Sequence, residues 1–106
     1  MKRTQLFFGG NIPGSKEKVT AAKFSKFVSA TVTPLFPMGL TIINCRGQWQ
    51  DEKTKKIEKE VTRILVLIHD GSKDENNKID FIKNLYKREF RQQSVMHIEE
   101  TVNVSF

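Results

Sequence analysis

The middle of the chain reads TPLFPMGLTIINCRGQW, residues 33–49. It begins with two prolines and a glycine, continues with β-branched residues, and closes on Gly-Gln-Trp. Because a proline ring cannot extend a helical hydrogen-bond ladder, Pro34 predicts the end of a preceding helix. The apolar run from Leu40 to Trp49 then predicts a strand. The segments before and after this stretch predict the remainder of one small sheet.

Two helices are predicted, one before and one after the central strands. The first begins near Thr20, a good N-cap, and its apolar residues recur at helical spacing: Phe24, Phe27, Val28 and Val32. The second begins at a capping box, in which Ser72 accepts a hydrogen bond from a free helix N–H and Glu75 reaches back. It runs to about Phe90, and its inward positions are Ile79, Ile82, Tyr86 and Phe90.

Three further strands are predicted, over residues 4–8, 61–69 and 94–106. The continuous apolar run of residues 64–68 is typical of a strand that is buried on both faces. The last strand alternates apolar residues at Val102, Val104 and Phe106. Residues 50–60 are almost wholly charged and predict a hairpin extension or a flexible loop.

The resulting order, β-α-β-β-α-β, predicts an α+β fold over a single domain, residues 1–106. With right-handed crossovers it gives a ferredoxin-like sandwich, a four-stranded antiparallel sheet with both helices on one face. The first and third strands would lie centrally. The other face would expose Phe7 or Phe8 and half of residues 64–68, more apolar surface than monomers tolerate. We therefore expect a homo-oligomer, a dimer or trimer, that covers this face.

Composition narrows the possible partners. The formal charge of +6 favours an anionic partner, although small basic proteins without one are also common. Cys45 is the single cysteine, which excludes an internal disulfide and a multi-cysteine zinc site. No membrane span or signal-peptide core is present, so a cytoplasmic location is expected. No metal or cofactor is expected, because the two histidines lack ligand spacing and Gly9-Gly10 is no phosphate-binding loop.

RNA binding is disfavoured. Residues 6–13, LFFGGNIP, are similar to the first ribonucleoprotein motif of RNA-recognition domains, which share the predicted fold. The third strand should then supply aromatic residues after a basic residue and a glycine. Residues 61–68, VTRILVLI, have neither.

The candidate ligand site is Gly47-Gln48-Trp49 with Glu60. If the second and third strands pair as a hairpin, Trp49 and Glu60 lie near each other, beside the loop of residues 9–15. Trp49 could stack on an aromatic or cationic ligand, Gln48 could hydrogen-bond it, and Glu60 could contact a positive or hydroxyl group. Residues available for an anionic group or for closing the site are Arg46, Arg63 and Gln93. Alternatively, Trp49 covers the rim of the core and Glu60 is a surface acid.

The chain resembles a family of bacterial and phage domains of unknown function, of the DUF3574 type. The matching pieces run in order from one end of the chain to the other: LFFG (6–9), TPLFPMGLT (33–41), GQW (47–49), Glu60, Tyr86-Lys87 with Phe90, QSV (93–95) and VSF (104–106). The resemblance implies a domain type and carries no activity.

A fainter similarity is to phage enzymes that cleave S-adenosylmethionine, which are ferredoxin-like oligomers with active sites between subunits. It implies that Trp49 and Glu60 occupy the places of a strand-end aromatic residue and a following glutamate, with residues 93–95 also alike. Those enzymes carry a tyrosine where this chain has Trp49. Three functions follow as expectations: binding of a nucleotide-like ligand at a subunit interface, an S-adenosylmethionine lyase with Glu60 catalytic, or a structural or protein-interaction module.

Overall fold

The computed structural model describes all 106 residues. Its elements follow the predicted order, with the first helix divided into three consecutive segments: β1 (Lys2–Gly9), α1 (Ala21–Phe27), η1 (Val28–Val32), α2 (Thr33–Leu35), β2 (Thr41–Gln50), β3 (Ile57–His69), α3 (Lys73–Glu89) and β4 (Met96–Thr101). The four strands form one sheet in the order β2-β3-β1-β4, and every pairing is antiparallel. Strands β1 and β3 are therefore central, as expected.

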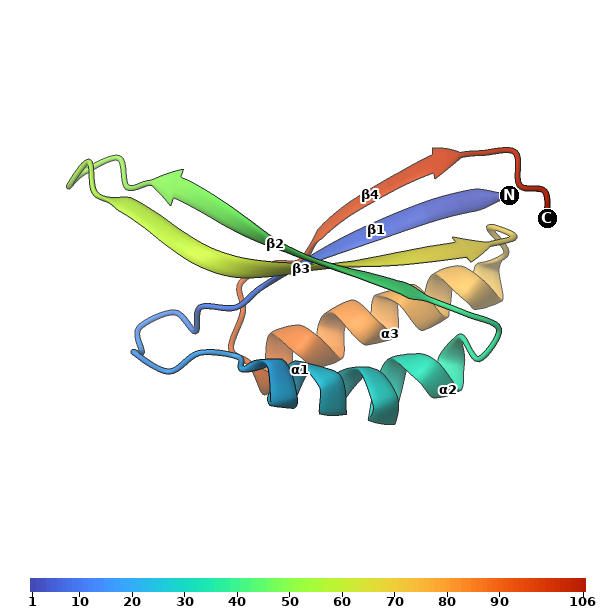
Figure 1. The fold of residues 1–106 in the computed structure, drawn as a ribbon, viewed down its shortest axis with the longest axis horizontal. Helices are drawn as coiled ribbons and strands as arrows, with labels where there is room; N and C mark the ends of the chain where they lie inside the picture. Colours follow the sequence, from blue (N-terminus) through green and yellow to red (C-terminus); the bar gives the residue numbers. More distant parts are fainter.

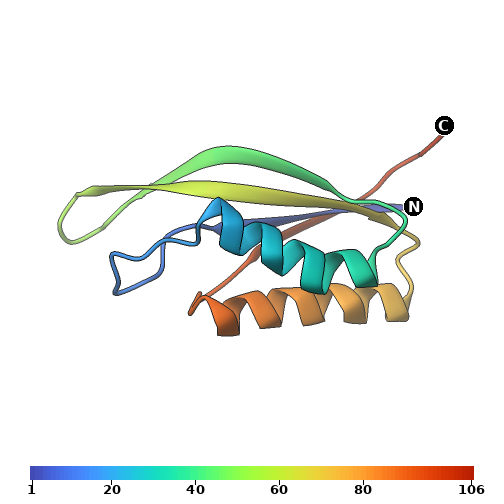
Figure 2. The ribbon, with the colours of Figure 1, turned by 60° about the horizontal axis from the view of Figure 1, so that its bottom comes forward.

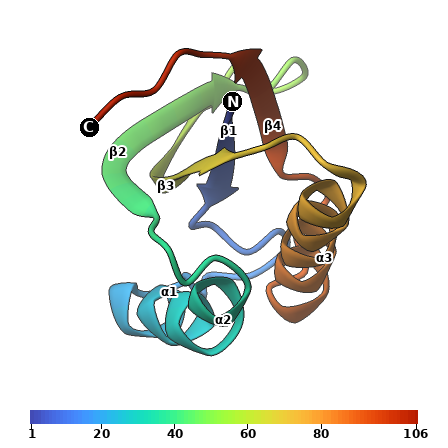
Figure 3. The same ribbon diagram turned by 90° about the vertical axis from the view of Figure 1, so that its right-hand side faces the viewer.

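The first helix, made of α1, η1 and α2, lies on the same face of the sheet as α3 (Figures 1 and 3). This arrangement confirms the predicted fold class, an α+β sandwich with a four-stranded antiparallel sheet. The core lies between the layers and contains fifteen buried hydrophobic residues. At its centre the ring of Phe8 lies 4.5 Å from that of Tyr86, and Phe27 lies 5.3 Å from Tyr86. Such tilted aromatic pairs add about 0.5–1.5 kcal/mol each beyond the area they bury.

The prediction that Pro34 ends the first helix was wrong. The helix passes through Pro34 and ends at Leu35, because the turn before it is a π turn. The N–H of Thr33 donates to the carbonyl of Val28, five residues back. Pro34 then occupies the first turn of α2, where it has no N–H that would need a partner. The wider turn relieves the clash that a proline ring makes with a preceding carbonyl in a regular α-helix.

The hairpin, the last strand and the capping box agree with the prediction in part. The hairpin extension is present: Gln50 and residues 57–60 belong to the β2–β3 ladder, and residues 51–56 connect the strands. This connection is closed by Asp51, whose Oδ1 accepts 2.8 Å bonds from two backbone amides. The last strand ends at Thr101, since β1 offers no residue to pair beyond its own beginning. The capping box is half formed: Ser72 accepts from the Glu75 amide, but the Glu75 carboxylate bonds Lys78 instead.

The second face of the sheet carries no helix and exposes a group of apolar residues, with Gln5 and the Arg3–Glu100 ion pair beside them. Strand alternation places Phe8 in the core and Phe7 on this open face. The other apolar residues of the open face, assigned from alternation and register, are Ile43, Ile64, Val66, Ile68, Met96 and Ile98. Met96 is 54% exposed and Ile43 is 44% exposed. The uncovered apolar face that the sequence predicted is therefore present.

Between β4 and α3 the helix-facing side of the sheet is polar. His69 is buried, and its Nδ1 accepts from the Gly71 amide at 3.1 Å, which assigns the hydrogen to Nε2. That nitrogen lies 2.7 Å from the Thr4 hydroxyl, which lies 3.2 Å from Glu99. This chain of hydrogen bonds gives His69 a structural role.

His97 is held neutral in the same polar layer. Its Nδ1 lies 3.2 Å from the Lys83 ammonium, and its Nε2 is buried without a partner, 3.8 Å from the Glu99 carboxylate. Burial, and then the charges of Lys83 and His69, lower the pKa of His97 below its ordinary 6.5, whereas Glu99 and Asp80 act against this shift. The native fold therefore prefers the neutral imidazole.

The His97→Gln variant is expected to show a weaker loss of stability at acidic pH. Because the native pKa of His97 is lowered, the unfolded chain takes up the proton first. The stability contribution of His97 is thus full above the unfolded pKa and is lost as the pH falls through the native pKa. Urea unfolding of both proteins at about pH 7.5 and about pH 5 measures the difference. Equal pH dependence in the two proteins would contradict this account.

Candidate functional site

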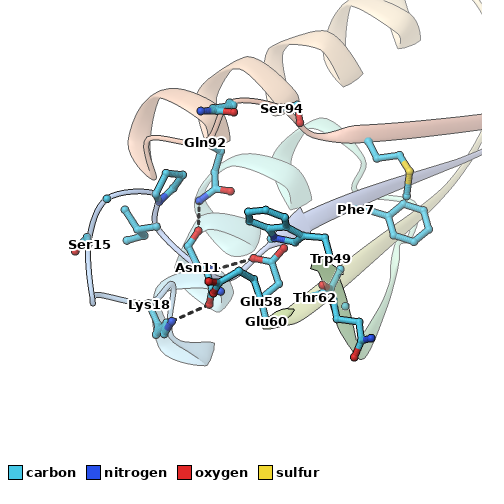
Figure 4. Close-up of a pocket in the computed structure, with 18 residues that line it drawn as sticks. Phe7, Asn11, Ser15, Lys18, Trp49, Glu58, Glu60, Thr62, Gln92 and Ser94 are labelled. Atoms are coloured by element: carbon cyan, nitrogen blue, oxygen red, sulfur yellow. Dashed lines mark hydrogen bonds between the residues drawn. The ribbon is translucent and has the colours of Figure 1, made fainter. Parts of the chain in front are cut away.

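A cavity of about 690 Å³ opens at the end of the sheet where β1 finishes. Four segments meet around it: the loop after β1, the end of β2, the facing part of β3 and the segment that leads into β4 (Figure 4). The β2–β3 hairpin extends past the helices at this end of the molecule, so one side of the cavity is a two-stranded ribbon (Figure 2). Ligand cavities commonly measure about 300–1,000 Å³.

Trp49 provides the largest apolar surface of the cavity. Trp49 pairs with Glu58 across the β2–β3 ladder and is 55% exposed. In Figure 4 the indole lies across the cavity, on the side of the Glu58 and Glu60 carboxylates. A flat ring in such a position is available for stacking.

The Glu60 carboxylate is fixed by the loop after β1. Its Oε2 accepts a hydrogen bond of 3.1 Å from the Asn11 amide. Gly9 on β1 leaves room for this approach, because a Cβ there would lie 2.9 Å from the same oxygen. Gly47, directly opposite Glu60 in the ladder, is also constrained: a Cβ there would lie 2.7 Å from the Thr62 hydroxyl. The glycine of Gly-Gln-Trp therefore makes room inside the cavity wall.

Asn11 joins the parts of the site and was missed by the sequence analysis. Besides its amide bond to Glu60, its side chain donates to the Lys59 carbonyl at 3.1 Å and accepts from the Lys18 ammonium at 2.9 Å. Its carbonyl accepts from Gln92 at 2.8 Å. The sequence offered one signal, an Asn directly after Gly9-Gly10, but its partners lie far away in the chain and no local pattern reveals them.

The core supports the same loop from below. The Tyr86 hydroxyl donates to the Gly9 carbonyl at 2.7 Å. Burial raises the pKa of Tyr86, so its phenol stays protonated and remains a donor. The position of the Glu60 carboxylate therefore depends on the packing between α3 and β1.

The cavity is acidic although the chain is basic. Among its lining residues the charged side chains are Glu58, Glu60 and Lys18, which sum to −1, against +6 for the chain. The Lys18 ammonium is engaged by Asn11, and Glu58 has Lys56 at 3.6 Å. An indole with two carboxylates nearby suits a ligand that combines a ring with a positive group.

The structure brings together four of the six residues singled out from the sequence: Gln48, Trp49, Glu60 and Gln93 all line the cavity. Arg63 does not, because it is buried beneath the sheet, where it donates to the Val19 carbonyl at 2.7 Å and lies over the Phe24 ring. Arg46 pairs with Val61 and lines a separate hollow with Lys59, on the other side of the hairpin. Gln48 lines both spaces.

No group of three or more His, Cys, Asp or Glu side chains is placed to hold a metal ion. Cys45 is half-buried, and its thiol donates to the Thr62 carbonyl at 3.4 Å. None of the helices has both the length and the apolar character needed to cross a membrane.

Residues 3–106 match the model of a family described as a protein of unknown function, DUF3574. The chain belongs to the DUF3574 family. No curated protein matches this DUF3574 chain in sequence.

Two solved structures are similar to this DUF3574 chain. One is a phage SAM lyase in complex with S-methyl-5'-thioadenosine, with a TM-score of 0.70 and 17% identity, covering 93% of this chain and 79% of the lyase. The other is a phage SAM lyase in the apo state, with a TM-score of 0.68 and 18% identity, covering 93% and 78%. At this identity the likeness establishes a shared fold.

Two neighbouring glycine substitutions should separate stability from the geometry of the site. A Cβ on Gly10 would lie 2.6 Å from the backbone oxygen of Val61, so Gly10→Ala should cost about 1–3 kcal/mol of unfolding free energy. A Cβ on Gly9 meets only the carboxylate at the end of the Glu60 side chain, which can rotate away, so Gly9→Ala should cost less. That rotation would break the hydrogen bond between the carboxylate and the Asn11 amide. Urea unfolding compares them, and a larger loss for Gly9→Ala would contradict the geometry.

Proposed function

We propose that the protein binds a small nucleotide-like ligand, an aromatic nucleoside with a positively charged substituent, in this cavity at a subunit interface. The observation that carries the proposal is the exposed indole of Trp49 beside the carboxylates of Glu58 and Glu60. Trp49 stacks on the base, and Gln48 and Gln93 supply hydrogen bonds. The phage SAM lyase of the same fold, which binds S-methyl-5'-thioadenosine, lends support because that ligand is a nucleoside thioether.

Charge favours a sulfonium or an amine over a phosphate on this ligand. A phosphate would face the carboxylates of Glu58 and Glu60, and the single lining lysine, Lys18, is already bonded to Asn11. The lining has a net charge of −1, so it repels an anion. The arginines that could have balanced a phosphate, Arg46 and Arg63, lie outside the cavity. A cation beside the indole and Glu60 instead gains both cation–π and ionic attraction.

The proposal includes a second copy packed against the open face of the sheet. Strands of about eight residues in four rows span roughly 26 Å by 19 Å, or about 500 Å² in projection. Side chains such as Phe7, Ile43 and Met96 project from this face, so its accessible area is larger than the projected area. It approaches the roughly 800 Å² that each partner buries in a standard interface. Phe7 and Met96 also line the cavity, so such a copy would close its open side. We place the protein in the cytoplasm, where a lone unpaired cysteine is usual.

A second candidate function is an S-adenosylmethionine lyase at the same site, favoured by the fold and by Glu60. In that reaction the bond between sulfur and the γ-carbon of the amino-acid chain breaks, and sulfur keeps both electrons to give S-methyl-5'-thioadenosine. The remaining fragment must either lose a proton from its β-carbon or close onto its own carboxylate. Glu60 could accept that proton or hold the sulfonium in place. Trp49 has no hydroxyl and moves no proton.

Trp49→Ala should weaken binding of S-methyl-5'-thioadenosine by about 1–3 kcal/mol, roughly 5- to 150-fold in Kd, through loss of stacking. Trp49 is the single tryptophan, so ligand should change the fluorescence of the wild-type protein directly. Calorimetry measures the Kd of S-methyl-5'-thioadenosine for the wild type and for each variant. Phe81→Ala, an aromatic residue of α3 that is 53% exposed and lies outside the cavity, is the matched control.

If neither S-methyl-5'-thioadenosine nor S-adenosylmethionine changes the fluorescence of Trp49, the ligand proposal is wrong. If Trp49→Ala and Phe81→Ala both bind as the wild type does, the cavity is not the site. Either outcome would bring the structural or protein-interaction module forward.

Glu60→Gln should reduce affinity for S-adenosylmethionine by about 10-fold and affinity for neutral S-methyl-5'-thioadenosine by much less. The glutamine can still accept the Asn11 amide bond, so the change removes charge and keeps the local geometry. Glu89→Gln, an exposed acid at the end of α3, is the control.

Glu60→Gln also distinguishes a protein that only binds S-adenosylmethionine from an enzyme that cleaves it. Chromatography of S-adenosylmethionine incubated with the protein detects any S-methyl-5'-thioadenosine formed. Turnover that Glu60→Gln abolishes would establish the lyase. Without turnover, and with equal losses of affinity for the two ligands, the assignment of Glu60 to the cation would be contradicted.

A further inference from the structure

Strand β2 is an edge strand with little to protect it. It forms the outer strand of the sheet beside β3, and eight of its ten residues are exposed. It carries a single charged residue, Arg46, and no proline, and its register with β3 runs without a bulge. Natural edge strands are normally blunted by charges, prolines, bulges or short length, because their free N–H and C=O groups invite another strand. The opposite edge, β4, is short and carries His97, Glu99 and Glu100.

The segment after β4, residues 102–106, has the residue pattern of a strand but pairs with no strand. Residues 102–106 read VNVSF, with no charge in a chain that is 28% charged. The Val102 amide donates to the Met1 carbonyl, and beyond it the tail joins no ladder (Figure 1). Val104 is 39% exposed and Phe106 is fully exposed. Alternation of apolar and small polar residues is typical of a strand with one buried face.

We propose that residues 102–106 of one copy add as a further strand to the free edge of β2 in a second copy. The backbone of the tail would pair with the outward N–H and C=O groups of β2. Val102, Val104 and Phe106 would then extend the apolar open face next to Ile43, which is 44% exposed. Asn103 and Ser105 would lie on the other side.

The tail cannot make this contact within its own chain. It begins at the end of β4, and three strand spacings, about 14 Å, separate β4 from β2. Residues 102–106 span at most about 17 Å when extended, so these five residues would be taken up in crossing the sheet and could not also run along the β2 edge. A second copy has no such limit. Reciprocal exchange of tails closes a dimer, and one-way exchange closes a larger ring.

This contact shares with the proposed function only the premise that copies associate, and it does not depend on what the cavity binds. It is also distinct from packing of the open faces. The edge contact depends on residues 102–106 and on the backbone of β2, whereas the face contact depends on side chains such as Phe7 and Met96, so substitution can separate the two.

The test is light scattering on the full chain at about 100 µM, where micromolar contacts are populated. The double variant Val104→Ser, Phe106→Ser removes the apolar side of the tail, and Asn103→Ala, Ser105→Ala is the matched control. The tail lies outside the core, so circular dichroism should show that both variants fold. We expect an oligomer for the wild type, at least about 10-fold weaker association for the first variant, and a change within about twofold for the control.

Amide exchange adds a readout specific to the edge. In a free edge strand alternate amides of β2 point outward and exchange rapidly, whereas an added strand protects them. Residues 41–45 should be protected throughout in the associated wild type and only at alternate positions in the tail variant. A wild-type monomer, unchanged association of the tail variant, or rapid exchange of the outward amides in the associated protein would each overturn the proposal. Loss of ligand binding with intact tail pairing would overturn only the proposed function.

Discussion

The contact between Tyr86 and β1 supports both the core and the cavity. The centre of the Tyr86 ring lies 4.5 Å from that of Phe8 on β1. The Tyr86 hydroxyl donates a hydrogen bond to the carbonyl of Gly9, the last residue of β1. From there Gly9 leaves space for Glu60, and the Asn11 amide fixes the carboxylate. The position of one acidic group at the surface is thus set by helix packing in the interior. A rigid layer beneath a site is what keeps a binding geometry reproducible.

Strand alternation separates two chemistries along the hairpin. On β3, Glu58 and Glu60 line the cavity, while the intervening Lys59 and Arg46 of β2 line the neighbouring hollow, which Glu60 also borders. The chain is therefore positively charged overall, while the lining of its cavity is negatively charged. A basic exterior with an acidic cavity can attract an anionic surface and still admit a cationic small molecule, because local potential depends on the nearest groups.

The sequence predicted the strand order and the layers because both follow from hydrophobic periodicity and the handedness of connections. It also brought Trp49 and Glu60 together, since hairpin pairing follows from chain order. It could not place Arg63, which reads as a polar residue in an apolar run until Val19 and Phe24 are seen to enclose it. Asn11 was missed because its hydrogen bonds reach Gln92, Lys59 and Glu60. Such contacts are set by tertiary structure, and no local rule contains them.

The π turn of Val28–Val32 also determines how the first helix meets the sheet. Four buried residues, Phe24, Val28, Val32 and the C-cap Phe36, form a row spaced by four, and Phe27 is buried beside this row. In a regular α-helix each step of four residues rotates the side chain by about 40° around the axis, so this row would wind away from the sheet. The wider turn takes up that excess rotation midway. One irregular turn therefore keeps this row of side chains on the buried side of the helix along its whole length.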